Sequence, residues 1–152
     1  MQKIVTYLWY NDQAEEAARF YTSLFKNASI KEVMPGPEGK AMGVTFDLEG
    51  QEFIALNGGP AFNFTEAISL FVKCETQDEV DHFWNALVAD GGAESRCGWL
   101  KDKYGLSWQI IPNKLGELMG HPDRERAGRA IQAMLQMNKI VIADLQKAFD
   151  GG

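Results

Sequence analysis

The sequence predicts an α+β protein of two tandem βαβββ modules, which form one curved mixed sheet pair and are followed by a C-terminal helical extension. Three observations support this fold class. The segment Glu15–Phe25 aligns with Asp78–Val88 at an offset of 63 residues, from 15 to 78. A short β-favouring run precedes each of these segments, and a D-x-x-G turn followed by another β-favouring run comes later in each half.

The two aligned segments are predicted to be amphipathic helices. In the alignment Phe20 meets Phe83 and Leu24 meets Leu87, so that the apolar positions fall at i and i+4 in both copies. Acidic residues occupy the first turn of each segment, where they interact favourably with the helix dipole. Each module therefore has one helix with a single buried face.

The strands follow from the same comparison. Val5–Trp9 lies over Ile68–Val72, and both runs favour β-structure. Further on, Asp47-x-x-Gly50 lies over Asp102-x-x-Gly105 at an offset of 55, from 47 to 102. The shorter second copy lacks an equivalent of the loop 35–42, PGPEGKAM, whose prolines and glycines indicate an extended turn between strands.

Side chains of a strand alternate between its two faces, which predicts what each strand presents to the helix. We expect Phe53 and Ala55, with Trp108 and Ile110, on the helix faces. A one-residue slip in register would invert this assignment. The residues expected on the opposite, concave faces are Val5, Tyr7, Trp9, Glu52, Ile54, Leu56, Ile68, Leu70, Val72, Ser107, Gln109 and Ile111.

The C-terminal segment lies outside the repeat and is predicted to be helical. Asp123 is a good N-cap for a helix that carries Ile131, Met134 and Leu135 on one face, and a second short helix should run from about 142 to 149. This methionine-rich tail could cover a sheet edge, contribute to a dimer contact or pack on its own domain. We expect a single domain over 1–152, with modules of about 1–60 and 61–116 and a tail over 117–152.

Composition excludes several classes of partner. The chain of 152 residues has a net charge of −6 and no basic run, so neither nucleic acid nor an anionic membrane surface is an expected partner. The N-terminus reaches Asp12 too soon for a signal peptide, and no stretch approaches the ~20 apolar residues of a membrane span. Two cysteines without a C-x-x-C motif are typical of a reducing compartment, and we expect a cytoplasmic protein.

Three stretches carry a resemblance to a known family: DKYGLSWQIIP at 102–112, EAARFY at 16–21 and AIQAMLQM at 130–137. With the two βαβββ copies, they resemble the PhnB-like branch of the vicinal oxygen chelate (glyoxalase / bleomycin-resistance / extradiol dioxygenase) superfamily. Proteins of this branch often carry the label 3-demethylubiquinone-9 3-methyltransferase. The resemblance covers nearly the whole chain and implies two modules facing each other around a pocket, commonly in a homodimer.

The resemblance also implies where a metal would bind. Metal-dependent relatives typically use one residue early in each first strand and a glutamate in each last strand. The matching positions are Val5, Ile68, Ile54 and Gln109; the first three cannot bind a divalent ion, and Gln109 offers only a neutral carbonyl. We therefore expect neither the usual metal nor another cofactor.

The methyltransferase label finds no support in the glycine pattern. A nucleotide-like methyl donor is usually held by a glycine-rich loop between a strand and a helix, and the chain has no G-x-G-x-x-G motif and no P-loop.

Individual candidates have both functional and structural interpretations. Gln109 would be the polar anchor of an apolar pocket, or an amide that bonds backbone or water inside a sheet. Glu52 would be a general base if buried and a rim carboxylate if not. Tyr7 and Trp9 suit a flat or ring-containing ligand. The candidate pocket residues are Gln109, Glu52, Tyr7, Trp9, Ile54, Val5 and Ile68, and no catalytic residue can be assigned.

The histidines and cysteines support no catalytic triad. His82 is expected to face solvent and His121 to have a loop or capping role, and neither has a recognisable carboxylate or cysteine partner. Cys74 and Cys97 are expected to be small buried hydrophobic residues.

Three functions are consistent with these features. The first is a small-molecule-binding protein without a metal, probed by metal analysis. The second is a metal-dependent lyase, isomerase or dioxygenase with relocated ligands, for which Glu52, Gln109 and His82 are the only donors. The third is a protein-interaction module that uses the acidic surface and the methionine-rich tail.

Overall fold

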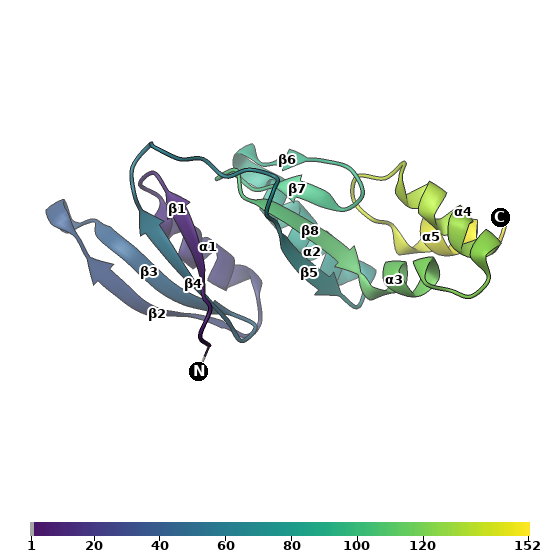
Figure 1. The fold of residues 1–152 in the computed structure, drawn as a ribbon, viewed down its shortest axis with the longest axis horizontal. Helices are drawn as coiled ribbons and strands as arrows, with labels where there is room; N and C mark the ends of the chain where they lie inside the picture. The colour runs from purple at the N-terminus through teal and green to yellow at the C-terminus, as the bar shows by residue number, and fades with distance from the viewer. Residues whose placement is uncertain (1) are drawn as a thin grey trace. The chain divides into compact units, whose positions relative to one another are not determined.

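The structure is a computed structural model that describes residues 2–152, and it divides into two compact units that part between Phe64 and Thr65 (Figure 1). Each unit contains one four-stranded mixed sheet. None of the helices in the described part of the chain is long and apolar enough to cross a membrane.

The first unit is a four-stranded sheet with one α-helix on one face. Its strand order is β1-β4-β3-β2, in which β1 runs parallel to β4 and the other neighbours are antiparallel. Helix α1 packs on β3, β2 and β4, and its buried face consists mainly of alanines with Tyr21. The elements are β1 (Thr6–Tyr10), α1 (Ala14–Leu24), β2 (Ala28–Pro35), a 3-10 turn η1 (Pro37–Gly39), β3 (Ala41–Leu48) and β4 (Gln51–Asn57).

The second unit has the corresponding strand order, β5-β8-β7-β6, with β5 parallel to β8. Helix α2 packs on the sheet, and three further helices follow β8. The prediction of an α+β fold with mixed sheets and a C-terminal helical extension is thus confirmed. The elements are β5 (Leu70–Cys74), α2 (Gln77–Val88), a 3-10 turn η2 (Ala89–Gly91), β6 (Ala93–Glu94), β7 (Trp99–Lys101), β8 (Ser107–Pro112), α3 (Asn113–Met119), α4 (Arg124–Met134) and α5 (Ile142–Phe149).

The predicted helix faces are confirmed for the last strand of each sheet. Phe53 and Ala55 in β4 are buried, as are Trp108 and Ile110 in β8. Apolar residues of the helices complete each core, because burying these side chains removes apolar surface from water. The face of each sheet opposite its helix, α1 or α2, is the open face.

The face predicted for 68–72 is wrong. The register pairs Leu70 with Trp108 and Val72 with Ile110, so both side chains point towards α2 instead of the open face. Ile68 precedes β5 and is 61% exposed. The reason is the link between strand and helix, which has three residues (11–13) in the first unit and two (75–76) in the second. The missing residue shifts the strand by one position and exchanges its faces.

The tail packs against its own unit. Asp123 caps α4 by accepting a hydrogen bond from the N–H of Arg126 at 3.2 Å, as predicted, and α5 has the predicted bounds. Helix α3 was not predicted. The apolar face of α4 was partly wrong, because its buried residues are Ala127 and Ala130, whereas Leu135 is exposed.

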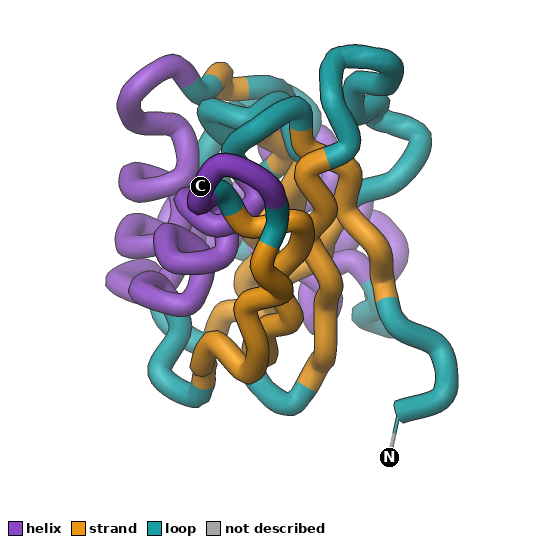
Figure 2. Tube along the Cα trace, turned by 90° about the vertical axis from the view of Figure 1, so that its left-hand side faces the viewer, coloured by secondary structure: helices purple, strands orange, loops and turns teal. Residues whose placement is uncertain are grey.

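A separate hydrophobic cluster holds the tail, and Figure 2, with helices in purple, shows the C-terminus lying among its helices. The side chain of Gln77 in α2 donates to the carbonyl of Ile140 at 3.0 Å and accepts from the N–H of Ile142 at 2.8 Å. The buried residues of the cluster are Ile111, Leu115, Leu118, Ala130, Ile140, Leu145 and Phe149.

Candidate functional site

The open face of the first sheet carries two of the predicted pocket residues side by side. Tyr7 in β1 is the register partner of Ile54 in β4, and Tyr7 remains 57% exposed. Both line a small hollow of about 60 Å³, whose walls are mostly apolar. Its other lining residues are Glu32, Met34, Met42, Gly43, Val44, Thr45 and Leu56.

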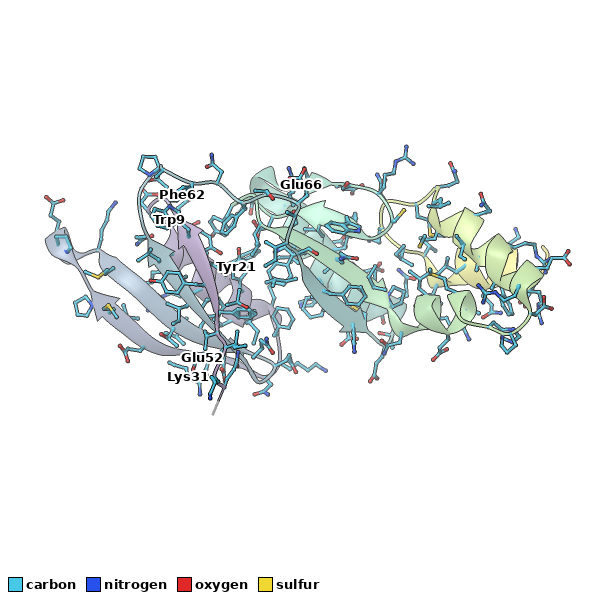
Figure 3. All side chains as sticks on the ribbon, in the orientation of Figure 1. Trp9, Tyr21, Lys31, Glu52, Phe62 and Glu66 are labelled. Carbon is cyan, nitrogen blue, oxygen red and sulfur yellow. The ribbon has the colours of Figure 1, made fainter. Side chains whose placement is uncertain are left out.

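Trp9 lies further along the same strand and is used to hold the chain that leaves β4. Its indole N–H donates to the carbonyl of Gly59 at 2.9 Å, and its ring meets Phe62 edge-on at 4.9 Å between centroids (Figure 3). A Cβ atom at Gly58 would lie 2.4 Å from the indole, so only glycine lets the ring approach the backbone there. Trp9 therefore packs against the segment 58–62 and has a structural role there.

Glu52 and Val5 lie at the other end of this face. Both are half-buried. Glu52 is the register partner of Asp47, which pairs with Lys31 at 3.5 Å. The main-chain N–H of Glu52 donates to the side chain of Gln2 at 2.9 Å. A general base is expected to be buried, and the half-exposed position of Glu52 fits a rim carboxylate better.

On the open face of the second sheet, Gln109 is positioned by a side-chain hydrogen bond. Its Nε2 donates to the Oγ of Ser69 at 3.0 Å. In the sheet Gln109 lies between Phe71, which is 53% exposed, and Trp99. Within residues 2–152 the Oε1 of Gln109 accepts no hydrogen bond, so this oxygen and the Ser69 hydroxyl hydrogen are available to a ligand. Sequence reasoning had not identified Ser69 or Phe71, because it placed β5 one residue out of register.

The residues at the family's metal positions do not fit a metal ion. Val5, Ile54 and Ile68 are aliphatic and supply no ligand atom, and Gln109 offers only its neutral amide oxygen, Oε1. Nowhere in the described residues do three histidine, cysteine, aspartate or glutamate side chains gather as a metal site requires.

Neither histidine has a catalytic geometry. His82 is exposed on α2 beside Phe83, with 4.9 Å between the ring centroids. The Nδ1 of His121 accepts from the main-chain N–H of Asp123 at 3.0 Å, which matches the capping role expected for it.

The two thiols differ in environment. Cys74 is completely buried, and burial, followed by the nearby carboxylate of Glu79, raises the pKa of its thiol to about 12. Cys97 is half-buried in the turn before β7. Because the thiolate is the reactive form, we expect Ellman's reagent at pH 8 to modify Cys97 and leave Cys74 untouched in the native protein. Two equivalents of released thiolate before denaturation would contradict this prediction; both cysteines should react in guanidinium chloride.

The D-x-x-G-x-x-W run is a buried hydrogen-bond network. Asp102 is 2% exposed; its Oδ1 accepts from the N–H groups of Tyr104 and Leu106 at 2.9 and 3.1 Å, and its Oδ2 accepts from the Trp108 indole at 2.9 Å. Gly105 has a φ of 88°, which glycine adopts without strain. The stretch 102–112, one of the three that carry the family resemblance, therefore shapes the β7–β8 turn and places β8, including Gln109.

Comparison with known proteins agrees with this scaffold. Residues 2–111 match the family model described as 3-demethylubiquinone-9 3-methyltransferase. A putative 3-demethylubiquinone-9 3-methyltransferase, PhnB protein, from Bacillus cereus is 39% identical, with a TM-score of 0.69 over 73% of this chain and 99% of that chain. Protein PA1353 from Pseudomonas aeruginosa is 20% identical and similar in fold, with a TM-score of 0.62 over 74% of this chain and 98% of its own.

A glyoxalase/bleomycin resistance protein from Albidiferax ferrireducens T118 is 17% identical, with a TM-score of 0.48, covering 70% of this chain and 95% of its own. No curated protein matches the chain. The family match ends at Ile111, so helices α3, α4 and α5 lie beyond it. From residue 2 to residue 111 the chain belongs to the PhnB-like family whose model is described as 3-demethylubiquinone-9 3-methyltransferase, as its sequence motifs predicted.

Proposed function

We propose that the chain binds a small, mostly apolar molecule on the open face of a sheet, without a divalent metal at the family's ligand positions. The observation that carries this proposal is the Gln109–Ser69 pair on the open face of the second sheet. The pair offers one acceptor and one donor beside the rings of Trp99 and Phe71. A few polar groups within an apolar surface are typical of small-molecule sites, where they fix the ligand's orientation.

The first test is a thermal-shift screen of a small-molecule library. A ligand at about 100 times its Kd stabilises the folded state by about 2.7 kcal/mol, which raises the melting temperature by several degrees. We expect hits to stabilise the native sequence but not Gln109→Leu, which removes the amide and keeps the volume. Gln136→Leu is the matched control, because Gln136 is exposed in the tail. Hits that stabilise Gln109→Leu equally would contradict the site, and a screen without hits would favour an interaction module.

The second test addresses the metal. We expect elemental analysis of the purified protein to find no stoichiometric divalent ion, and chelation to leave ligand binding unchanged. The reason is that aliphatic side chains at Val5, Ile54 and Ile68 supply no ligand atoms. A bound ion in one-to-one ratio, lost on chelation together with ligand binding, would establish the metal-dependent enzyme with relocated ligands instead.

The wider organisation is also part of the proposal: a duplicated βαβββ module in a cytoplasmic protein that forms a homodimer. The homodimer is supported by the exposed apolar residues of the open face, among which Tyr7, Met34 and Met42 are about half exposed. Light scattering at several concentrations tests it, and a mass of 17.0 kDa throughout would contradict it.

A further inference from the structure

The first hollow described above lies in the first unit. Another hollow lies in the second unit, at the end of the sheet where β7 turns into β8. It has a volume of about 260 Å³. Register pairs Lys101 with both Ala93 and Ser107, so these three residues form one row across β6, β7 and β8 on the open face. Trp99 and Glu66 also line the hollow, and Figure 3 shows Glu66 beside the β6–β7 hairpin. The remaining lining residues are Glu94, Ser95 and Leu100.

The hydroxyl of Ser107 is the unusual group in this hollow. The residue is 1% exposed, and within residues 2–152 its Oγ is the only buried side-chain oxygen or nitrogen without a hydrogen-bond partner. A buried hydroxyl loses its bonds to water on folding, so leaving it unpaired is unfavourable. Native proteins pair nearly all such groups, which indicates that Ser107 serves something not made of this chain's own residues.

The ammonium group of Lys101 is placed so that it can exchange its present carboxylate partner, Glu66, for the carboxylate of a ligand. Lys101 Nζ contacts Glu66 Oε1 at 3.3 Å, and both side chains are substantially exposed, at 44% and 65%. Exposed ion pairs contribute little to stability, so a competing carboxylate can displace Glu66 at small cost. Glu94, in contrast, is engaged elsewhere: its two oxygens accept from Trp84 at 3.3 Å and from Asn138 at 3.2 Å.

The pKa of Glu66 is lowered, chiefly by a hydrogen bond from its own backbone and then by the hydrogen bond and charge of Lys101. Glu66 is therefore ionised at neutral pH and already places a carboxylate where Lys101 can hold one. A carboxylate of a ligand would make the same contact.

We propose that this hollow binds a small organic carboxylate: its carboxylate replaces Glu66 at Lys101 and accepts a hydrogen bond from Ser107, and its apolar part packs on Trp99. The inference rests on the proposed small-molecule function: Trp99 lines the hollow and is the register partner of Gln109, so the hollow adjoins the Gln109–Ser69 pair, and the inference adds the chemical class of the ligand. Hydrogen bonds to a charged group are stronger than neutral ones, so the Ser107 hydroxyl favours a carboxylate over an amide.

Benzoate and its neutral analogue benzamide are matched probes, titrated while the indole N–H signal of Trp99 is followed by NMR. Trp99→Phe identifies that signal among the four tryptophans. We expect benzoate to shift it in a saturable way and benzamide to bind at least tenfold more weakly. Lys101→Gln and Ser107→Ala should each weaken benzoate about tenfold, and Glu66→Gln should strengthen it severalfold by removing the competitor.

Ser107→Ala should fold normally because it removes an unpaired hydroxyl, and Lys114→Gln breaks an exposed ion pair with Glu117 elsewhere and should not change benzoate binding. Equal binding of benzamide and benzoate would overturn the carboxylate inference and leave the small-molecule function standing. A Trp99 signal that benzoate never shifts would overturn the inference, and a library screen without hits would then overturn the proposed function as well.

Discussion

Replacing Asp102 with alanine should lower the free energy of unfolding of the second unit by about 4 kcal/mol, the largest effect we expect from a single substitution. The carboxylate is buried and accepts three hydrogen bonds, from the main-chain N–H groups of Tyr104 and Leu106 and from the indole of Trp108. Alanine would leave all three donors without an acceptor inside the protein, and each unsatisfied buried donor costs about 1–3 kcal/mol. Urea unfolding followed by far-ultraviolet circular dichroism measures the change.

Two further variants distinguish the loss of the Asp102 hydrogen bonds from the loss of a negative charge. Asp102→Asn keeps the shape and one oxygen, so it should cost about 2 kcal/mol, since the amide NH₂ would face a donor. Asp47→Asn is the matched control: Asp47 stands at the same place in the first unit's D-x-x-G run, where it makes a partly exposed ion pair with Lys31. We expect less than about 1 kcal/mol there. Equal losses at 47 and 102 would refute a special role for the Asp102 network.

Gly98→Ala should destabilise the second unit by about 3 kcal/mol and loosen the tail from the sheet. Gly98 has a φ of 85°, which costs a non-glycine residue about 1–2 kcal/mol. A Cβ atom there would also lie 2.5 Å from the Cδ1 of Ile111 and 3.2 Å from Ile140, and overpacking a core costs about 1–3 kcal/mol. The N–H of Gly98 donates to the carbonyl of Asn138 at 2.8 Å, so displacing this turn pulls on the segment that leads into α5.

Gly105→Ala is the control that measures the cost of a positive φ without the cost of overpacking. Gly105 has a nearly identical φ of 88°, and nothing lies within 4 Å of where its Cβ would stand. We therefore expect about 1 kcal/mol from this substitution. Hydrogen exchange of the α5 amides, measured beside urea unfolding, should become faster in Gly98→Ala and stay unchanged in Gly105→Ala. Similar behaviour of the two variants would show that packing against the tail plays no part.

Some features of the candidate site follow from the alternation of side chains along a strand, and others depend on contacts between residues far apart in the sequence. Tyr7, Ile54 and Gln109 lie on open faces as predicted, because alternation within a strand fixes the face once the strand is recognised. Trp9 was expected in a pocket, and its bond to Gly59 could not be predicted, because that contact joins residues 50 positions apart. Ser107 was assigned to the correct face, but its unpaired hydroxyl is visible only when every neighbouring donor and acceptor is placed.

By itself, the sequence determined the α+β class, the mixed sheets, the C-terminal helical extension with the Asp123 cap of α4, and membership of the PhnB-like family. These depend on local signals, such as apolar periodicity, turn residues and a capping aspartate, that act within a few residues. The tertiary structure alone decided which face β5 presents, because a two-residue link in place of three reverses it and only the pairing with β8 reveals the register. It also decided that the D-x-x-G-x-x-W run is a hydrogen-bond network, and that Gln109 meets Ser69, since both depend on atoms brought together by folding.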